Sequence, residues 1–342
     1  MPYIDKNGKP VLWEETDYFN QYRKALIYYP VKAKRISGVP DCDFTYEILV
    51  SPTPTPTQTG TPTPTPTQTG TPTPTPTPSA PSIDPDAAAY LADVVTSGGT
   101  TNPTIDAAVN TLFTSLKSVG LYSYMEAMYP FVGATALSHS INATLNKTFD
   151  ITWYGGLTHN ISGTTGNGTN GYGDTHFNTA LYFPQDDFSV GFYQTTNNTT
   201  NNGFNLGYFE GVADQPLVQL SSNYAGTYWL RAGDSGPQST TANSGNVDGQ
   251  YIVSRTSSSL ARMYRNTTGV LDYTRTYVTG AGSALSMFVW TFANNGGIPF
   301  NTYSNQEMNF IFFMSKGLSA SEVSTLDNII NTFQTSLGRN IY

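Results

Sequence analysis

The chain has 342 residues, of which 12% are charged and 13% aromatic, and its formal net charge is −8. The acidic balance argues against a nucleic-acid-binding protein, and the single cysteine, Cys42, excludes an intrachain disulfide framework and a cysteine-based zinc site. Low charge together with abundant Asn, Thr, Ser and Gly is typical of a β-rich extracellular or particle-surface protein.

Residues 1–50 form a first segment that combines charged side chains with aromatic ones. Its aromatic residues include Trp13, Tyr18, Phe19, Tyr22, Tyr28 and Tyr29. Because so small a segment buries little core, we expect it to be an anchor that docks on a partner through these side chains. A small head with an ordinary aromatic core is the alternative.

The start of the chain is polar and has no signal-peptide core. No run approaches the ~20 apolar residues of a membrane span, so we expect no membrane partner. Assembly inside a cell into a released particle would explain a surface-type composition without a secretion signal. A processed precursor or a dedicated secretion system would explain it as well.

Residues 51–80 repeat a ten-residue Thr-Pro unit three times, as SPTPTPTQTG, TPTPTPTQTG and TPTPTPTPSA. Proline at alternate positions excludes a helix or a central strand. An extended polyproline segment rises ~3.1 Å per residue, so this stalk can reach roughly 90 Å. Its expected role is to hold the C-terminal part of the chain away from residues 1–50.

Residues 81–147 predict a short helical collar. Asp84 and Pro85 are a cap and first-turn signal for a helix that stops near Ser97. A second helix is expected from Thr104 to Gly120, where apolar residues share one face. The stretch SYMEAMYPFVG, residues 123–133, predicts a further short turn of helix.

From about Thr148 the hydrophobic period changes to two, which is typical of strands. Polar turn clusters separate many of the runs, and this spacing predicts a β-sandwich or jelly roll over 148–342. The expected strands begin at Phe149 and continue at 180–183, 188–193, 205–211, 217–220, 227–231, 250–255, 260–266, 272–278, 286–292 and 308–315. A capping box, Ser319 to Glu322, opens a C-terminal helix whose apolar stripe is expected to pack on the sandwich.

The order of these features resembles the concanavalin A-like, or laminin G-like, jelly roll. The residues that carry this resemblance are Ala261–Gly269, similar to a hairpin motif of that family, and Leu318–Val323, similar to the turn that leads into its last helix. Thr267 and Thr268 depart from the hairpin motif. The resemblance implies a mainly β fold of a class that includes lectins and glycosidases.

A second resemblance is to a domain found at the ends of phage structural and fibre proteins. It covers about residues 84–342 and does not reach residues 1–50. Its motifs are the helix Ile105–Gly120, Met128–Gly133, Asn167–Thr175 and Phe333–Arg339. The resemblance implies a place on the virion surface.

The sequence does not favour catalysis. A retaining glycosidase needs two carboxyl groups about 5–5.5 Å apart, and the Glu-x-Asp-x-x-Glu strand motif of sandwich glycosidases is absent. The glutamates after the stalk are Glu126, Glu210, Glu307 and Glu322. No Gly-x-Ser-x-Gly elbow supports Ser-His-Asp catalysis. We therefore predict a protein that is not an enzyme.

The sequence also predicts no cofactor. His139, His159 and His176 lack metal-binding spacing, which favours surface or hydrogen-bonded roles. Ca²⁺ remains an alternative, because some jelly-roll lectins bind it. Oxygen ligands would come from Asp174, Asp186, Asp187 and Asp248, but no ordered spacing supports such a site.

The segment 166–178 is the candidate carbohydrate site, predicted as a polar loop. Amide, carboxylate and aromatic side chains of the kind that hold sugars gather in it. These are Asn167, Asn170, Tyr172, Asp174, His176 and Asn178. The alternative is a loop in which Asn and Gly only form turns. Tyr193, Tyr208, Tyr224, Trp229 and Tyr303 are further aromatic candidates.

Together these features predict an appendage on the surface of a phage virion. Residues 1–50 would bind a capsid or tail protein, and the distal sandwich would bind host-surface or environmental glycans. We expect a homo-oligomer whose many copies offset weak single sites. A purely structural capsid decoration, a tail-fibre receptor-binding protein or polysaccharide depolymerase, and a cellular adhesin are the alternatives.

Overall fold

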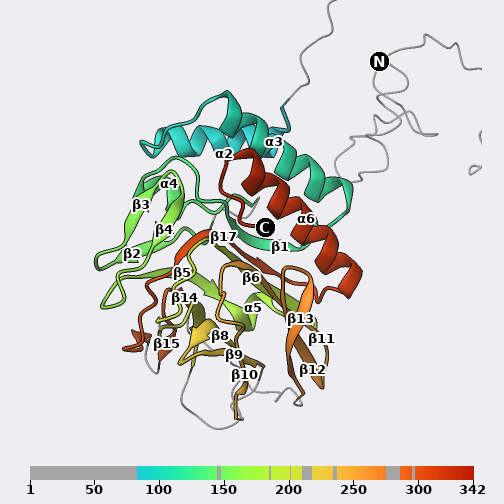
Figure 1. The fold of residues 1–342 in the computed structure, drawn as a ribbon. Helices are drawn as coiled ribbons and strands as arrows, with labels where there is room; N and C mark the ends of the chain where they lie inside the picture. Colours follow the sequence, from blue (N-terminus) through green and yellow to red (C-terminus); the bar gives the residue numbers. More distant parts are fainter. Residues whose placement is uncertain are drawn as a thin grey trace, which may run out of the picture. The chain divides into compact units, whose positions relative to one another are not determined.

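The computed structural model describes residues 83–144, 148–184, 186–200, 202–209, 218–233, 237–274, 286–294 and 297–342. They belong to one unit, Pro78–Tyr342. Two sheets pack face to face, and helices cover the outer face of one sheet (Figure 1). The predicted fold class, a mainly β sandwich with a C-terminal helix, is confirmed. The predicted anchor and stalk, residues 1–50 and 51–80, lie outside the described residues.

The first sheet has eight strands, which are β1 Met125–Tyr129, β3 Thr158–Asn160, β4 Gly163–Thr165, β6 Phe188–Gln194, β11 Gly249–Ser257, β12 Leu260–Arg265, β13 Thr268–Tyr273 and β17 Glu307–Met314. Their order is β13-β12-β11-β6-β17-β4-β3, and β1 also pairs with β17. All these pairs are antiparallel.

The second sheet has nine strands, which are β2 Thr152–Tyr154, β5 Tyr172–Asn178, β7 Leu206–Tyr208, β8 Val218–Tyr224, β9 Thr227–Ala232, β10 Ser239–Ala242, β14 Ser286–Val289, β15 Ala293–Asn294 and β16 Ile298–Pro299. The main path is β10-β9-β8-β7-β14-β5-β2, and β15 joins β7 and β16 at the side. Strand β2 is therefore an edge strand.

The helices are α2 Pro85–Thr96, α3 Pro103–Ser118, α4 Ala136–Ser140, α5 Thr179–Tyr182 and α6 Ala320–Ser336, with a 3₁₀ turn at Tyr122–Tyr124. Helices α2, α3 and α6 lie together over the eight-stranded sheet (Figure 1). In the part of the chain that the structure describes, no helix is long and apolar enough to cross a membrane.

Strand β17 shows why the sandwich needs this third layer. Ile311 and Phe313 face the core between the sheets, whereas Phe310 and Phe312 face the helices. All four side chains are fully buried. Burial of each large apolar side chain contributes roughly 1.5–3 kcal/mol, so both faces of this strand must be covered.

The cap signals predicted from the sequence operate in the structure. Asp84 accepts hydrogen bonds from the first amides of α2, and Asn102, which was not predicted as a cap, does the same for α3. Ser319 and Glu322 form the complete capping box of α6. Lys117 also pairs with Asp84, so the point where the described chain begins is fixed on the helical layer.

One predicted helical turn and one predicted strand are wrong. In the stretch 123–133 the short helix ends at Tyr124, and Met125–Tyr129 is strand β1, because pairing with β17 satisfies its backbone. Residues 180–183, predicted as a strand, overlap helix α5, where the Phe183 amide donates to the Thr179 carbonyl in a helical turn.

The hairpin motif near Gly269 forms a two-residue turn between β12 and β13. Asn266 and Thr267 both have positive φ, at 47° and 69°, which is the geometry that matches the twist of a hairpin. The Asn266 side-chain oxygen also accepts a hydrogen bond from the Gln250 amide. The two threonines that depart from the family motif therefore lie one in the turn and one at the start of β13.

Two motifs of the phage resemblance contact each other inside the unit. Arg339 is buried, and its guanidinium donates to the carbonyls of Phe131 and Pro130 at 2.9 and 3.2 Å. Gly133 has φ 97°, and a Cβ there would collide with Ser138. These motifs thus lock the chain between β1 and α4 to the end of α6, which is a structural role.

We predict that Arg339→Ala lowers the free energy of unfolding by about 2–4 kcal/mol, because each buried carbonyl left without a donor costs about 1–3 kcal/mol. Denaturant unfolding measures this loss. Arg262→Ala is the matched control, since its pair with Asp272 is exposed and should contribute less than about 1 kcal/mol. Equal losses for the two variants would contradict the prediction.

Candidate functional site

The segment predicted as a polar loop is half strand. Residues Tyr172–Asn178 form β5, and successive strand side chains point to opposite faces. Thr175 and Phe177 are fully buried in the sandwich, whereas Tyr172, Asp174 and His176 lie on the outer face. The sequence prediction of a loop is wrong here because the buried residues are few and separated by polar ones.

Asn167 and Asn170 lie in the turn that precedes β5, and Asn167 organises it. The Asn167 side-chain oxygen accepts from the amides of Thr169, Asn170 and Gly171 at 2.9–3.0 Å. Its amide nitrogen donates to the Asn170 side-chain oxygen at 2.7 Å. Asn167 is thus a turn-forming residue. Asn178 ends β5 opposite Ser286.

A bulge in β5 sets the direction of the His176 side chain. The register with β14 shifts between Ser286 and Phe288, and His176 has a positive φ of 55°. A non-glycine residue in this region is strained by about 1–3 kcal/mol. Bulges often redirect a side chain beside a functional site, and this one leaves the His176 side chain 47% exposed.

An aromatic stack stands beside this histidine. Tyr154 of β2 lies opposite Tyr172, and their rings stack at 4.8 Å with planes only 13° apart. On its other side, Tyr172 stacks on Phe288 at 5.1 Å. Tyr154 is 43% exposed and Phe288 is buried. The stack therefore presents one flat ring to solvent on a rigid base.

Burial raises the pKa of the Tyr172 phenol above its usual value, and Tyr154, Tyr303 and Asp174 add to this effect electrostatically. The hydroxyl consequently stays protonated and can donate a hydrogen bond throughout the neutral range.

Three polar side chains meet next to the stack. The Thr152 hydroxyl and His176 Nε2 are 2.8 Å apart. Asp174 Oδ1 accepts from the His176 backbone amide at 2.9 Å, and Asp174 Oδ2 lies 3.7 Å from His176 Nδ1. The outer face thus combines a flat apolar ring with hydroxyl, imidazole and carboxylate groups.

Sequence reasoning missed Thr152 and Tyr154, although a signal was present. Phe149, Ile151 and Trp153 form one alternating apolar face in the sequence. The same alternation places Thr152 and Tyr154 on the opposite face, and the structure exposes both.

The further aromatic candidates divide into two groups. Tyr193 and Tyr208 are buried, so they do not belong to an open site. Tyr224, Trp229 and Tyr303 are half-buried, and Tyr303 approaches Tyr172 at 6.4 Å.

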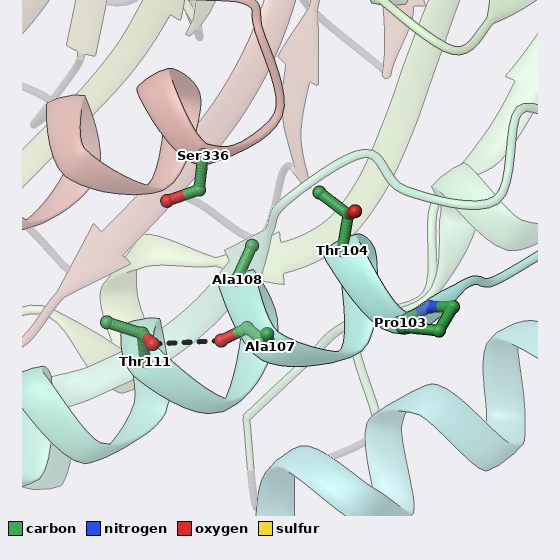
Figure 2. A pocket seen from close by; sticks show the side chains of 6 residues that line it. All are labelled: Pro103, Thr104, Ala107, Ala108, Thr111 and Ser336. Carbon is green, nitrogen blue, oxygen red and sulfur yellow. Dashed lines mark hydrogen bonds between the residues drawn. The ribbon is translucent and has the colours of Figure 1, made fainter.

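A hollow of about 400 Å³ lies between α3 and α6, on the helical layer (Figure 2). Small side chains line it, and none is aromatic or charged. They are Pro103, Thr104, Ala107, Ala108, Thr111 and Ser336. The hollow therefore lacks the stacking surface and the directed polar groups that the face of β5 has.

The aspartates considered for Ca²⁺ have separate partners. Asp186 pairs with the buried Arg255, and Asp187 accepts from the Gly317 amide. Asp248 pairs with Arg265, while Asp174 belongs to the site. Over the described ranges, no three His, Cys, Asp or Glu side chains gather as metal ligands.

Two histidines that the sequence analysis did not connect contact each other, with His139 buried and His159 half-buried. His139 and His159 have their Nδ1 atoms 3.3 Å apart, and both contact the Thr164 hydroxyl at 3.0 and 3.1 Å. Burial lowers the pKa of His139 to about 3, helped by His159 and Arg339. Burial also lowers the pKa of His159 to about 4. Both rings are therefore neutral near pH 7.

No family model and no curated protein matches the chain. Solved structures of similar architecture include domain 4 of AbnA, an extracellular arabinanase of Geobacillus stearothermophilus solved with arabinotriose. It is 13% identical, with a TM-score of 0.41, and the match covers 60% of this chain and 98% of that domain.

Two further neighbours are larger proteins. Trypanosoma rangeli sialidase, solved with sialic acid, is 16% identical with a TM-score of 0.45, over 62% of this chain and 33% of the sialidase. A botulinum neurotoxin type C structure, from work on its interaction with two ganglioside molecules, is 9% identical with a TM-score of 0.45. The match covers 62% of this chain and 53% of the toxin chain. Similarity at this level does not identify a ligand for this chain.

We predict that the free energy of unfolding falls as the pH drops below about 6.5, because the unfolded histidines take up protons there, whereas buried His139 and half-buried His159 stay neutral until pH 4–3. Each histidine can lower the free energy of unfolding by up to about 1.4 kcal/mol for each pH unit of this range. In His139→Gln, unfolding curves measured between pH 7 and 4 should show a shallower dependence. An unchanged slope would contradict the neutral pair.

We also predict that His176→Val lowers the free energy of unfolding by about 1–3 kcal/mol, because a β-branched residue is strained at positive φ. His176→Gly, which removes the same imidazole but tolerates this backbone, should lose much less. Thermal and denaturant unfolding compare the two variants. If both variants lose the same free energy of unfolding, the contacts of the imidazole, and not the backbone strain of the bulge, determine stability here.

Proposed function

We propose that the described unit binds carbohydrate on the outer face of its nine-stranded sheet. The observation that carries this proposal is the exposed Tyr154 ring stacked on Tyr172, with Thr152, Asp174 and His176 beside it. A sugar is a ring with apolar C–H faces and a rim of hydroxyl groups. An aromatic platform with a few directed polar groups matches both properties.

The rigidity of the platform supports this function. Tyr172 is held between Tyr154 and Phe288, so little side-chain entropy is lost when a ligand covers the stack. Asp174 is an acceptor for sugar hydroxyls, and the Tyr172 hydroxyl is a donor. The turn formed by Asn167 fixes the start of β5, so the strand delivers these groups in one orientation.

The layer order also suits a displayed binding face. The described chain begins at Ile83 and Asp84, on the helical layer. That layer covers the eight-stranded sheet, and the candidate face is the outer surface of the other sheet. Within the unit, the site therefore faces away from the layer where the chain enters.

We further propose that the protein is a surface appendage of a bacteriophage virion. The Thr-Pro stalk and the resemblance of residues 84–342 to phage structural and fibre domains support this proposal. Residues 1–50 would bind a capsid or tail protein, and the sandwich would contact glycans of the host or its surroundings. Several weak sites on one particle gain avidity without any new contact.

We predict that the full chain binds oligosaccharides on a glycan array and that Tyr154→Ala and Tyr172→Ala each weaken binding at least about tenfold, because aromatic residues covered by the ligand dominate the energetics of binding sites. Isothermal titration with the best array ligand measures the change. Tyr124→Ala is the matched control and should bind as the wild type does, because Tyr124 is exposed to a similar degree but lies in the 3₁₀ turn, outside the nine-stranded sheet.

Other outcomes separate the alternatives. If no carbohydrate binds and deletion of residues 81–342 destabilises particles without affecting attachment, the protein is a structural decoration. Release of reducing ends from a host capsule would instead indicate a depolymerase. Unchanged binding in both tyrosine variants would show that the carbohydrate site does not lie on β2 and β5.

A further inference from the structure

We propose that Thr152, His176 and Asp174 act together as a nucleophile, a general base and an orienting acid that hydrolyse acyl esters. The natural substrate class would be an O-acylated sugar held on the Tyr154 and Tyr172 stack. The identity of this substrate rests on the proposed carbohydrate binding, whereas the ester chemistry does not.

The geometry follows the roles of a hydroxyl–imidazole–carboxylate triad. Thr152 Oγ1 lies 2.8 Å from His176 Nε2, within the range that lets a base take the hydroxyl proton. On the other side of the imidazole, Asp174 Oδ2 lies 3.7 Å from Nδ1, and catalytic contacts of this kind commonly tighten when substrate binds. Such triads are recognised by geometry and not by sequence position.

The backbone holds the three residues in these roles. Thr152 and Asp174 are directly paired across β2 and β5, so their side chains lie side by side on one face. The bulge at His176 then turns the imidazole between them, at the cost of a positive φ. Asp174 fixes the bulge itself, since Oδ1 accepts the His176 amide. Strain of this kind often persists where function requires it.

An amide donor for the developing oxyanion lies at the next residue. The Ile151 amide bonds the Ser140 carbonyl, on the side of β2 away from β5. Because the backbone amides of an antiparallel strand alternate in direction, the Trp153 amide points to that same side of β2, where α4 lies. A backbone amide beside the nucleophile is a common component of an oxyanion site.

The proposed reaction needs no cofactor. Thr152 Oγ1 attacks the ester carbonyl carbon while His176 Nε2 takes its proton. The ester C–O bond then breaks, and the leaving sugar oxygen receives that proton. Water attacks the acyl-threonine, again with His176 as the base, and the Oγ1–acyl bond breaks to release a carboxylic acid and restore the hydroxyl.

The test measures release of p-nitrophenol from p-nitrophenyl acetate by the full chain, because this small ester needs no sugar binding. We expect Thr152→Val and His176→Gln each to lower the rate above buffer at least about 100-fold, the usual contribution of a general base. Thr240→Val, an exposed threonine of β10 in the same sheet, is the control and should keep the wild-type rate.

Trapping of the intermediate separates a triad from a reactive surface histidine. Acid-quenched protein should carry an acetyl group on the peptide that contains Thr152, and Thr152→Val should lack it. The proposal is overturned if the wild type hydrolyses no faster than buffer, if Thr152→Val keeps the wild-type rate, or if acetylation occurs only on lysines.

Failure of this proposal and failure of carbohydrate binding are distinguishable. Ester hydrolysis without any glycan binding would leave the triad in place and refute the binding function. Glycan binding that depends on Tyr172, together with no hydrolysis of either p-nitrophenyl acetate or an acetylated form of the bound glycan, would support the binding function and refute the triad.

Discussion

Strand β17 is apolar on both faces, and the architecture depends on that constraint. Its alternate side chains enter two different clusters, one between the sheets and one beneath α2, α3 and α6. The strand also pairs with β1, β4 and β6. A two-layer sandwich would leave Phe310 and Phe312 in water, so the helical layer is an essential part of the fold. One consequence is that the helices cover the β17 region of the eight-stranded sheet, whereas the candidate site lies on the nine-stranded sheet.

Much of the fold was predictable because its signals are local. Caps such as Ser319 and the stripe of α6 need only a few neighbouring residues, and the long strands alternate clearly. One error occurred where a distant strand determines the local structure. Met125–Tyr129 becomes a strand because it pairs with β17, which lies far along the sequence. Residues 179–182 form a helical turn although their composition suits a strand.

The candidate site was predictable in part for the same reason. The sequence identified Tyr172, Asp174 and His176 by side-chain type, and the structure places them on one face of β5. Their partners Thr152 and Tyr154 come from β2, and only the pairing of the two strands brings them near. The bulge at His176 depends on tertiary register, which no short motif encodes. The meeting of His139 and His159 likewise depends on how α4, β3 and β4 pack.

The scaffold and the site therefore use alternate positions along the same strands. Buried residues of alternate positions build a rigid sheet, and the exposed positions between them are free to carry function. The central claim is that a sugar ring lies on the Tyr154 and Tyr172 stack. A crystal structure of the chain with an oligosaccharide that it binds in solution tests this directly. The account predicts a sugar ring over Tyr154 with hydroxyl contacts to Asp174 or His176. An oligosaccharide ordered only elsewhere, for example in the hollow between α3 and α6, would contradict it.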